Sequence, residues 1–192
     1  MEQLLSIDTA IFQLINQMPH TILLDGCASM ASGLGYFIFI WIGIGGWILF
    51  KQEQKDHWFF WLMASVGSVG WILSEWILKP LIARDRPFIA LTPIVLYPTP
   101  NGYAFPSTHS VIAFSMAYII TRKMKRFQWA IWLTAILIAW SRIYSGHHFP
   151  LDVIGGAGLG LFLGWIGYSI YLSIKSNQQK NKKHITKKEK TV

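Results

Sequence analysis

The stretch LDVIGGAGLGLFLGWIGYSIYLSI, residues 151–174, decides the fold class, because it carries no charged side chain after Asp152. A transmembrane α-helix needs about 20 consecutive and mostly apolar residues. The stretch therefore predicts a helix that crosses a membrane. Glycines recur in it every four residues, at Gly156, Gly160 and Gly164, which predicts close packing against another helix of the same bundle.

The composition of the whole chain agrees with a membrane protein. Of its 192 residues, 53% are hydrophobic, 15% are aromatic and only 14% are charged, whereas an ordinary soluble domain has about 25% charged residues. The length suits one domain. Cys27 is the single cysteine, so the sequence excludes an internal disulfide and a zinc site made of several thiolates.

Four further apolar stretches precede residues 151–174 and are separated by polar breaks. They cover residues 29–50, 58–78, 107–120 and 127–143. We therefore predict an all-α, polytopic membrane helix bundle with about five transmembrane helices, which forms one membrane-embedded domain over residues 1–174.

Residues 4–18 form an apolar segment of a different kind. The segment is interrupted by Asp8 and is too short to span a bilayer. We predict an amphipathic helix that lies in the membrane interface. A helix that caps the bundle is an equal alternative, and the bundle would then have six helices.

The C-terminal segment KSNQQKNKKHITKKEKTV, residues 175–192, has seven lysines and no apolar periodicity. Such a composition is typical of disordered segments. We therefore predict a basic, disordered tail.

The cations predict the direction of the chain in the membrane. Lys and Arg number 17 and Asp and Glu number 9, which gives a formal net charge of +8. In a five-span topology thirteen of these 17 cations lie on one side, in the loop after residue 50, the turn at 122–126 and the tail. Because short cytoplasmic segments are enriched in Lys and Arg, we place the C-terminus in the cytoplasm and the N-terminus outside a cytoplasmic (inner) membrane. The expected partner of the basic chain is then a lipid bilayer and not a nucleic acid.

The four remaining cations, Lys79, Arg84, Arg86 and Arg142, belong to motifs that the topology brings to the outer surface. The motifs are KPLIARDRP (79–87), PSTH (106–109) and SRIYSGHHFPLD (141–152). Arg and Lys side chains stabilise the non-bridging oxygens of a phosphoryl group during its transfer. Backbone amides and a hydroxyl at the start of a helix can bind the same oxygens. The motifs therefore predict a phosphate site.

The same motifs contain a nucleophile and an acid. Asp152 lies four residues after His148, so its carboxylate can accept a hydrogen bond from one ring nitrogen and leave the other free to attack phosphorus. His109 is suited to protonate the leaving oxygen and then to activate water. The sequence offers no cluster of carboxylates for magnesium or zinc. We therefore predict covalent catalysis without a metal or another cofactor.

Together the three motifs resemble the three-part signature of the type 2 phosphatidic acid phosphatase superfamily of integral membrane lipid phosphatases, which includes bacterial undecaprenyl pyrophosphate phosphatases. The resemblance covers about residues 79–152 and keeps the family's spacings. It implies that His148 is the nucleophile, Asp152 its partner and His109 the acid/base. It also implies five phosphate-binding residues, which are Lys79, Arg86, Ser107, Thr108 and Arg142. Thr108 stands where many members have glycine, which bears on substrate fit more than on the chemistry.

Other residues near the motifs receive weaker predictions. Glu75 lies well inside a predicted span and four residues before Lys79, on the same helix face. We expect Glu75 to orient Lys79 or a neighbouring phosphate-binding group, with a protonated structural carboxyl as the alternative. Arg84 receives no role, and we expect His147 to pack rather than react. Residues 88–104 form a loop long enough either to cover the site or to lie along the surface.

These observations predict an enzyme that hydrolyses a lipid phosphate or pyrophosphate at the outer face through a phosphohistidine at His148. The resemblance to bacterial undecaprenyl pyrophosphate phosphatases implies that the reaction converts undecaprenyl pyrophosphate to undecaprenyl phosphate and phosphate. Alternatives are a phosphatidylglycerophosphate or phosphatidate phosphatase and, from another class, a non-catalytic lipid-binding membrane protein. The complete set of His148, Asp152 and His109 argues against the non-catalytic alternative. The sequence leaves the lipid and the oligomeric state open.

Overall fold

The computed structural model describes residues 2–32, 43, 57–96, 99 and 101–189 of the chain, and its side chains up to residue 180. All of the regular structure in these ranges is helical, which confirms the all-α class. The helices are α1 (Glu2–Asn16), α2 (Ile22–Ser32), α4 (His57–Ile72), the π-helical η1 (Leu73–Leu78), α5 (Lys79–Ile82), α6 (Pro87–Ala90), α7 (Thr108–Lys123), the 3₁₀ turn η2 (Lys125–Phe127), α8 (Gln128–Tyr144) and α9 (Pro150–Glu189).

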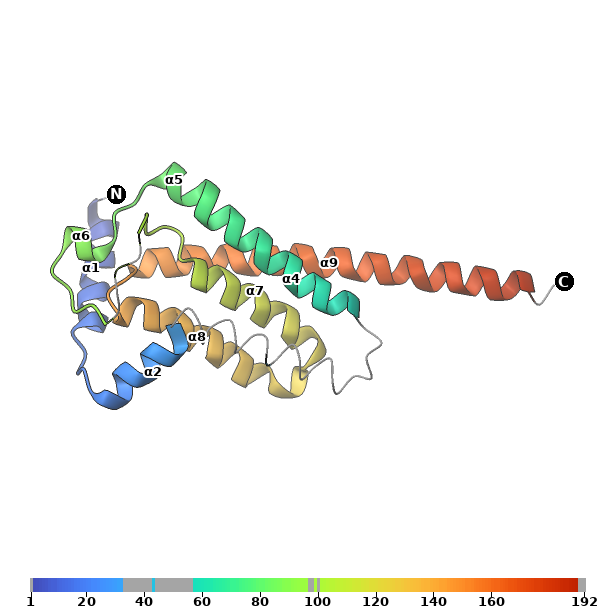
Figure 1. The fold of residues 1–192 in the computed structure, drawn as a ribbon, viewed down its shortest axis with the longest axis horizontal. Helices are drawn as coiled ribbons and strands as arrows, with labels where there is room; N and C mark the ends of the chain where they lie inside the picture. The colour runs from blue at the N-terminus through green and yellow to red at the C-terminus, as the bar shows by residue number, and fades with distance from the viewer. Residues whose placement is uncertain (1, 33–42, 44–56, 97–98, 100, 190–192) are drawn as a thin grey trace.

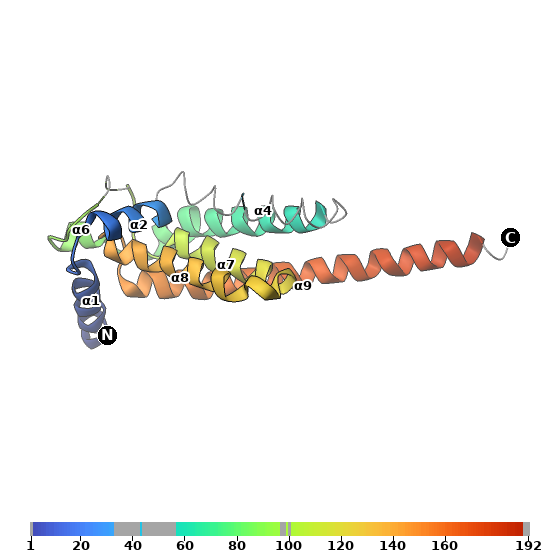
Figure 2. The ribbon, with the colours of Figure 1, turned by 90° about the horizontal axis from the view of Figure 1, so that it is seen from below.

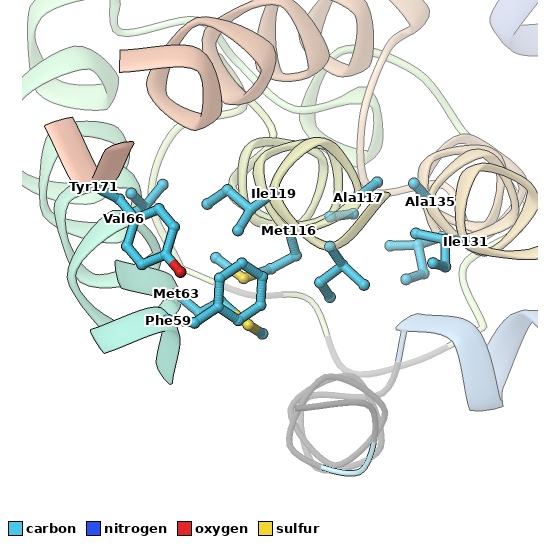
Figure 3. Packing of buried hydrophobic residues seen from close by; sticks show 12 residues of the cluster. Phe59, Met63, Val66, Met116, Ala117, Ile119, Ile131, Ala135 and Tyr171 are labelled. Atoms are coloured by element: carbon cyan, nitrogen blue, oxygen red, sulfur yellow. The ribbon is translucent and has the colours of Figure 1, made fainter. Parts of the chain in front are cut away.

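Helix α7 lies at the centre of the bundle and packs against α4, α8 and α9 (Figure 1). Figure 3 shows the apolar core between them. Phe59, Met63 and Val66 of α4 meet Met116 and Ile119 of α7. On the other side of α7, α8 contributes small and branched side chains to the same core.

The glycine stripe of α9 packs against α7, inside the bundle, as its spacing predicted. A Cβ atom on Gly156 would lie 2.6 Å from the Ser107 carbonyl oxygen, and one on Gly160 would lie 2.3 Å from that of Val111. These distances are too short for a side chain, so the two helices approach as closely as they do because the positions are glycine. The start of α9 is thereby fixed against the start of α7.

Of the five predicted membrane spans, four coincide with helices. Helix α4 continues through η1 into α5, and α7, α8 and α9 correspond to the remaining three. The span predicted at 29–50 lies almost entirely outside the described residues, and α2, which begins at Ile22, enters it. Two helical stretches in the described ranges are long and apolar enough to cross a membrane by themselves, at Trp58–Ala90 and Pro150–Lys180.

Helix α1 crosses the end of the bundle at a steep angle to the long helices (Figure 2). It turns Asp8, Phe12 and Asn16 toward the protein, where all three are buried. Most of its other apolar side chains, such as Leu4 and Leu14, are exposed. The helix thus caps the bundle with a partly polar stripe and leaves most of its apolar side chains exposed.

The prediction of a disordered tail is wrong where the structure describes it, because α9 continues without interruption to Glu189. The segment from 175 onward contains no Gly or Pro and has seven Lys, two Gln and one Glu, all of which have favourable helix propensities. Because it extends an existing helix, it also avoids the cost of nucleation. The lack of apolar periodicity in this segment argues against packing on other helices, but it does not exclude a helix exposed to solvent.

Candidate active site

The three motifs meet at one end of the bundle, where α5, the start of α7 and the α8–α9 connection come together (Figure 1). The Ser107 amide donates to the Asp152 carbonyl oxygen at 3.0 Å and so joins the second motif to the third. Arg86 Nη1 donates to the His147 carbonyl oxygen at 3.2 Å and joins the first to the third. The convergence that the sequence predicted is therefore present in the structure.

Three cations are buried at this end. The exposed fractions of Lys79, Arg86 and Arg142 are 5%, 2% and 6%. Lys79 donates to Glu75 Oε1 at 2.5 Å, whereas Arg86 donates from Nε to the Gly102 carbonyl oxygen at 2.9 Å. Removing charged groups from water is costly unless anions compensate for it. A cluster with more cations than nearby carboxylates is therefore suited to an anionic ligand.

The polypeptide around Lys79 departs from regular helix. Glu75 lies in the π-helical segment η1, and Ala83 ends α5 in the left-handed region with a φ of 48°. Single π-helical turns are frequent at functional sites. Glu75 Oε1 accepts hydrogen bonds from both Lys79 and the Thr108 hydroxyl, the latter at 2.6 Å. The predicted contact between Glu75 and Lys79 is present, and Thr108 adds a link to α7.

His148 lies on the α8–α9 connection, within the third motif and beside Arg86 of the first. Its Nδ1 is 3.6 Å from Asp152 Oδ2, and its Nε2 is 3.4 Å from Arg86 Nη1. The backbone amide of His148 donates to the Arg142 carbonyl oxygen at 3.2 Å and closes the turn after α8. One ring nitrogen thus faces the carboxylate, while the other faces the buried cations.

The environment of His148 keeps its imidazole neutral. Burial, followed by the nearby charges of Arg142 and Arg86, holds the pKa of His148 well below its usual value. A neutral imidazole has a free lone pair and can act as a nucleophile at neutral pH.

The start of α7 supplies hydrogen-bond donors and the second histidine. Ser107 occupies the N-cap position, and its buried Oγ has no hydrogen-bond partner among the described residues. Thr108 and His109 form the first turn of the helix, whose amides have no intrahelical acceptors. His109 is partly buried and lies within electrostatic range of Arg142 and Lys79. These groups are placed to contact an anion held by the cations.

Two residues of this end were not assigned to the site from the sequence. Arg84 donates from Nη1 to Asp152 Oδ1 at 2.6 Å, and it also donates to Asp8 of α1. Two features of the sequence could have indicated them: Arg84 is a second arginine within the first motif, and Asp8 is a carboxylate that interrupts an apolar segment. His147, by contrast, is buried with Nδ1 2.9 Å from Ser145 Oγ and its ring edge-on to Phe88, which fits the predicted packing role.

The loop after α6 is tied down by hydrogen bonds at several points in its described part, including one from the Ala104 amide to the Arg84 carbonyl oxygen at 2.8 Å. Asn16 of α1 donates to the Ile94 carbonyl oxygen and accepts from its amide, at 2.8 and 2.9 Å. Farther along, the Gly102 carbonyl oxygen accepts from Arg86.

In the described ranges, no three His, Cys, Asp or Glu side chains gather where they could hold a metal ion.

Comparison with known proteins identifies the family. Residues 57–175 match the model of the PAP2 superfamily. The chain belongs to the PAP2 superfamily. It is therefore a hydrolase of phosphate esters and, like the phosphatases of this superfamily, acts on lipid substrates.

Individual members of the PAP2 superfamily agree with this assignment. The chain is 31% identical to a lipid A 4'-phosphatase of Porphyromonas gingivalis over 92% of its own length and 78% of the relative's. It is 29% identical to an undecaprenyl-diphosphatase of Sulfolobus acidocaldarius over 88% of its own length and 81% of the relative's. The crystal structure of Aquifex aeolicus LpxE superimposes with a TM-score of 0.66 at 30% identity, covering 85% of this chain and 95% of that one.

Proposed function

We propose that this PAP2 protein removes a terminal phosphate from a membrane lipid through a phosphohistidine at His148. The observation that carries the proposal is the position of the His148 ring, with Nδ1 toward Asp152 and Nε2 beside Arg86. A histidine held in this way has one nitrogen oriented by a carboxylate and the other directed at the place where the cations would bind phosphate.

In the first step, His148 Nε2 attacks phosphorus, and the bond between phosphorus and the lipid oxygen breaks. The electron pair of that bond stays on the leaving oxygen, which takes a proton from His109. Asp152 stabilises the positive charge that develops on the imidazole. In the second step, His109 takes a proton from water, the water oxygen attacks phosphorus and the P–N bond breaks. The products are phosphate and neutral His148.

The cations supply the stabilisation of the transition state. Lys79, Arg86 and Arg142 are positioned by the protein before substrate binds, so little reorganisation is needed as charge shifts among the phosphoryl oxygens. The Ser107 hydroxyl and the first amides of α7, including that of Thr108, add donors. We propose that these groups take the place of a metal ion in the reaction.

For the substrate, we propose undecaprenyl pyrophosphate, which would yield undecaprenyl phosphate and phosphate. The undecaprenyl-diphosphatase among the relatives supports this choice. A lipid A phosphate is the second candidate, which the relative of Porphyromonas gingivalis supports. Phosphatidylglycerophosphate and phosphatidate present the same phosphate group on other lipids and remain the alternatives from the sequence.

A substrate panel tests this proposal. Purified protein in detergent with excess chelator is incubated with each of the four lipids, and released phosphate is measured beside the His148→Ala variant. We expect the highest kcat/KM on undecaprenyl pyrophosphate and no release by the variant. A higher kcat/KM on another lipid would replace the proposed substrate. Activity that disappears in chelator and returns with magnesium would contradict the metal-independent reaction.

We also propose that the site faces outward and that the end of α9 lies in the cytoplasm. The exposed cations of the turn between α7 and α8 and the lysines of α9 lie at the bundle end opposite the motifs (Figure 1). Single cysteines placed in a Cys27→Ser background test this orientation. A membrane-impermeant maleimide should label Tyr103→Cys but not Arg126→Cys in intact cells, and the reverse pattern would invert the topology.

A further inference from the structure

Arg84 joins two buried carboxylates that lie far apart in the sequence. Its Nη1 donates to Asp152 Oδ1 at 2.6 Å, and its Nη2 donates to Asp8 Oδ2. The guanidinium also lies over the Phe149 ring, with Cζ 4.5 Å from the ring centroid, in the geometry of a cation–π contact. These contacts fix both the position and the plane of the Arg84 side chain.

Asp8 is held as firmly as Arg84. Its exposed fraction is 2%, and its Oδ1 accepts a hydrogen bond from the Leu151 amide at 2.8 Å. This bond attaches α1 to the first turn of α9, one residue before Asp152. A buried carboxylate is costly unless it is paired and hydrogen-bonded. Contact between α1 and a membrane would not require a buried carboxylate on the side of the helix that faces the protein.

The network determines how Asp152 meets His148. Asp152 is fully buried, and Arg84 occupies its Oδ1. Its Oδ2 accepts from the Phe149 amide at 2.8 Å and is the oxygen that faces His148 Nδ1. Without Arg84, the Asp152 carboxylate would keep only the Phe149 amide of the two contacts that fix its rotation, and two buried carboxylates would share one site without their cation.

Asp8 sets the charge of the network. Asp152 and Arg84 alone sum to zero, and a neutral pair would do little to stabilise the charge that His148 gains as Nε2 bonds to phosphorus. With Asp8 the three residues carry a net charge of −1 in a buried site, where charges interact strongly.

We propose that Arg84 and Asp8 are positioning residues for the Asp152–His148 pair, and that α1 thereby completes the active site. This inference rests on the proposed function, in which His148 is the nucleophile. It assigns a catalytic contribution to the N-terminal helix, which lies outside all three motifs and outside the residues that match the family model.

The test compares steady-state constants of purified variants on the best lipid of the panel. Asp8→Asn should lower kcat roughly tenfold, the loss expected for one charge-assisted hydrogen bond, while KM stays within about twofold of wild type. Arg84→Met should lower kcat by about 100-fold, because it leaves buried carboxylates unpaired. Arg84→Lys, which keeps the cation, should recover about tenfold of that loss.

Two control variants remove the same chemical groups elsewhere. Glu2→Gln changes an exposed carboxylate on α1, and Arg126→Met removes an exposed arginine at the opposite bundle end. Both should retain wild-type kcat and KM. Thermal unfolding and gel-filtration profiles identify variants that lose activity because they fail to fold. If Arg84→Met is one of them, the kcat values of Arg84→Lys and Asp8→Asn decide instead.

The outcomes separate this inference from the proposed function. If His148→Ala abolishes turnover while Asp8→Asn and Arg84→Met keep wild-type kcat, the positioning role is wrong and the nucleophile stands. Variants in which KM rises and kcat is unchanged would also overturn it, because they would indicate substrate binding. If His148→Ala retains full activity, the proposed function itself fails.

Discussion

The two ends of this bundle carry the same kinds of cation in opposite surroundings. At the motif end, Lys79, Arg86 and Arg142 are buried and held by hydrogen bonds or neighbouring side chains. At the other end, Arg122 and Arg126 in and after α7 are exposed, and their guanidinium groups lie over the Tyr118 and Phe127 rings. Arginine and lysine therefore serve two purposes in one chain.

The difference shows what a count of charges can and cannot indicate. Exposed cations at helix ends keep their hydration, so they destabilise the fold little, and they set the orientation through the positive-inside rule. Buried cations lose hydration free energy, and an anion nearby offsets that loss. Burial is a property of the folded structure and cannot be read directly from the sequence. It separates the cations expected to bind substrate from those expected to set the orientation in the membrane.

The largest effect should follow from removing one buried arginine. Arg86→Ala should lower kcat/KM by about 100-fold or more, the usual loss for a preorganised donor to a transition state. Arg126→Ala should leave kcat/KM within about twofold of wild type, because its charge is exposed at the far end. Phosphate release from detergent-solubilised lipid measures both variants. Equal losses at the two ends would show that burial does not distinguish the cations.

Glu75 provides a smaller test at the motif end. Its carboxylate accepts from Lys79 and Thr108, so Glu75→Gln should misplace Lys79 and lower kcat/KM roughly tenfold. Thr108→Ala removes only one of the two bonds and should have a smaller effect. If kcat/KM is unchanged in Glu75→Gln, the Glu75 carboxyl does not position Lys79 for the reaction and has a structural role only.

Packing beside the site should matter more than packing elsewhere on α9. A Cβ on Gly156 would meet the Ser107 carbonyl oxygen at 2.6 Å, whereas one on Gly158 would meet nothing within 4 Å. Gly156→Ala should therefore lower the free energy of unfolding by about 1–3 kcal/mol, and Gly158→Ala should leave it unchanged or raise it. Thermal unfolding in one detergent compares them. Equal melting temperatures would contradict the close contact.

The smallest predicted effect is a shift in pH dependence. Because burial and the cations lower the pKa of His148, the acidic limb of kcat/KM should lie below the usual histidine value of about 6.5. Removing a nearby cation favours the protonated imidazole, so Arg142→Gln should move that limb to higher pH. Arg126→Gln should not move it. If the acidic limb shifts equally in both variants, the titrating group is not His148 but belongs to the substrate.

Much of this architecture was predictable from the sequence, because apolar runs of sufficient length and three spaced motifs carry most of the information. The positions of α7 and α8 agree with the predicted spans to within a few residues at most of their ends. The predicted nucleophile pair lies together because His148 and Asp152 are close in the chain. Arg86 meets them because the topology brings the motif ends to one surface.

The remaining features depend on contacts between distant residues. Nothing in the sequence pairs Asp8 with Arg84, which are 76 positions apart. The π-helical turn around Glu75 has no pattern that predicts it, since its apolar neighbours fit an ordinary helix equally well. The helical tail beyond residue 175 was missed because composition predicts packing better than it predicts local backbone structure.

The central claim, a covalent intermediate on His148, is tested most directly by trapping it. Wild type and His148→Ala are mixed with undecaprenyl pyrophosphate labelled in its terminal phosphate, with chelator present, and quenched within one turnover. We predict label on wild-type protein that is stable in alkali, is lost in acid as expected of a P–N bond, and maps to the peptide containing His148. Label that survives in His148→Ala, or that maps to another residue, would contradict the account.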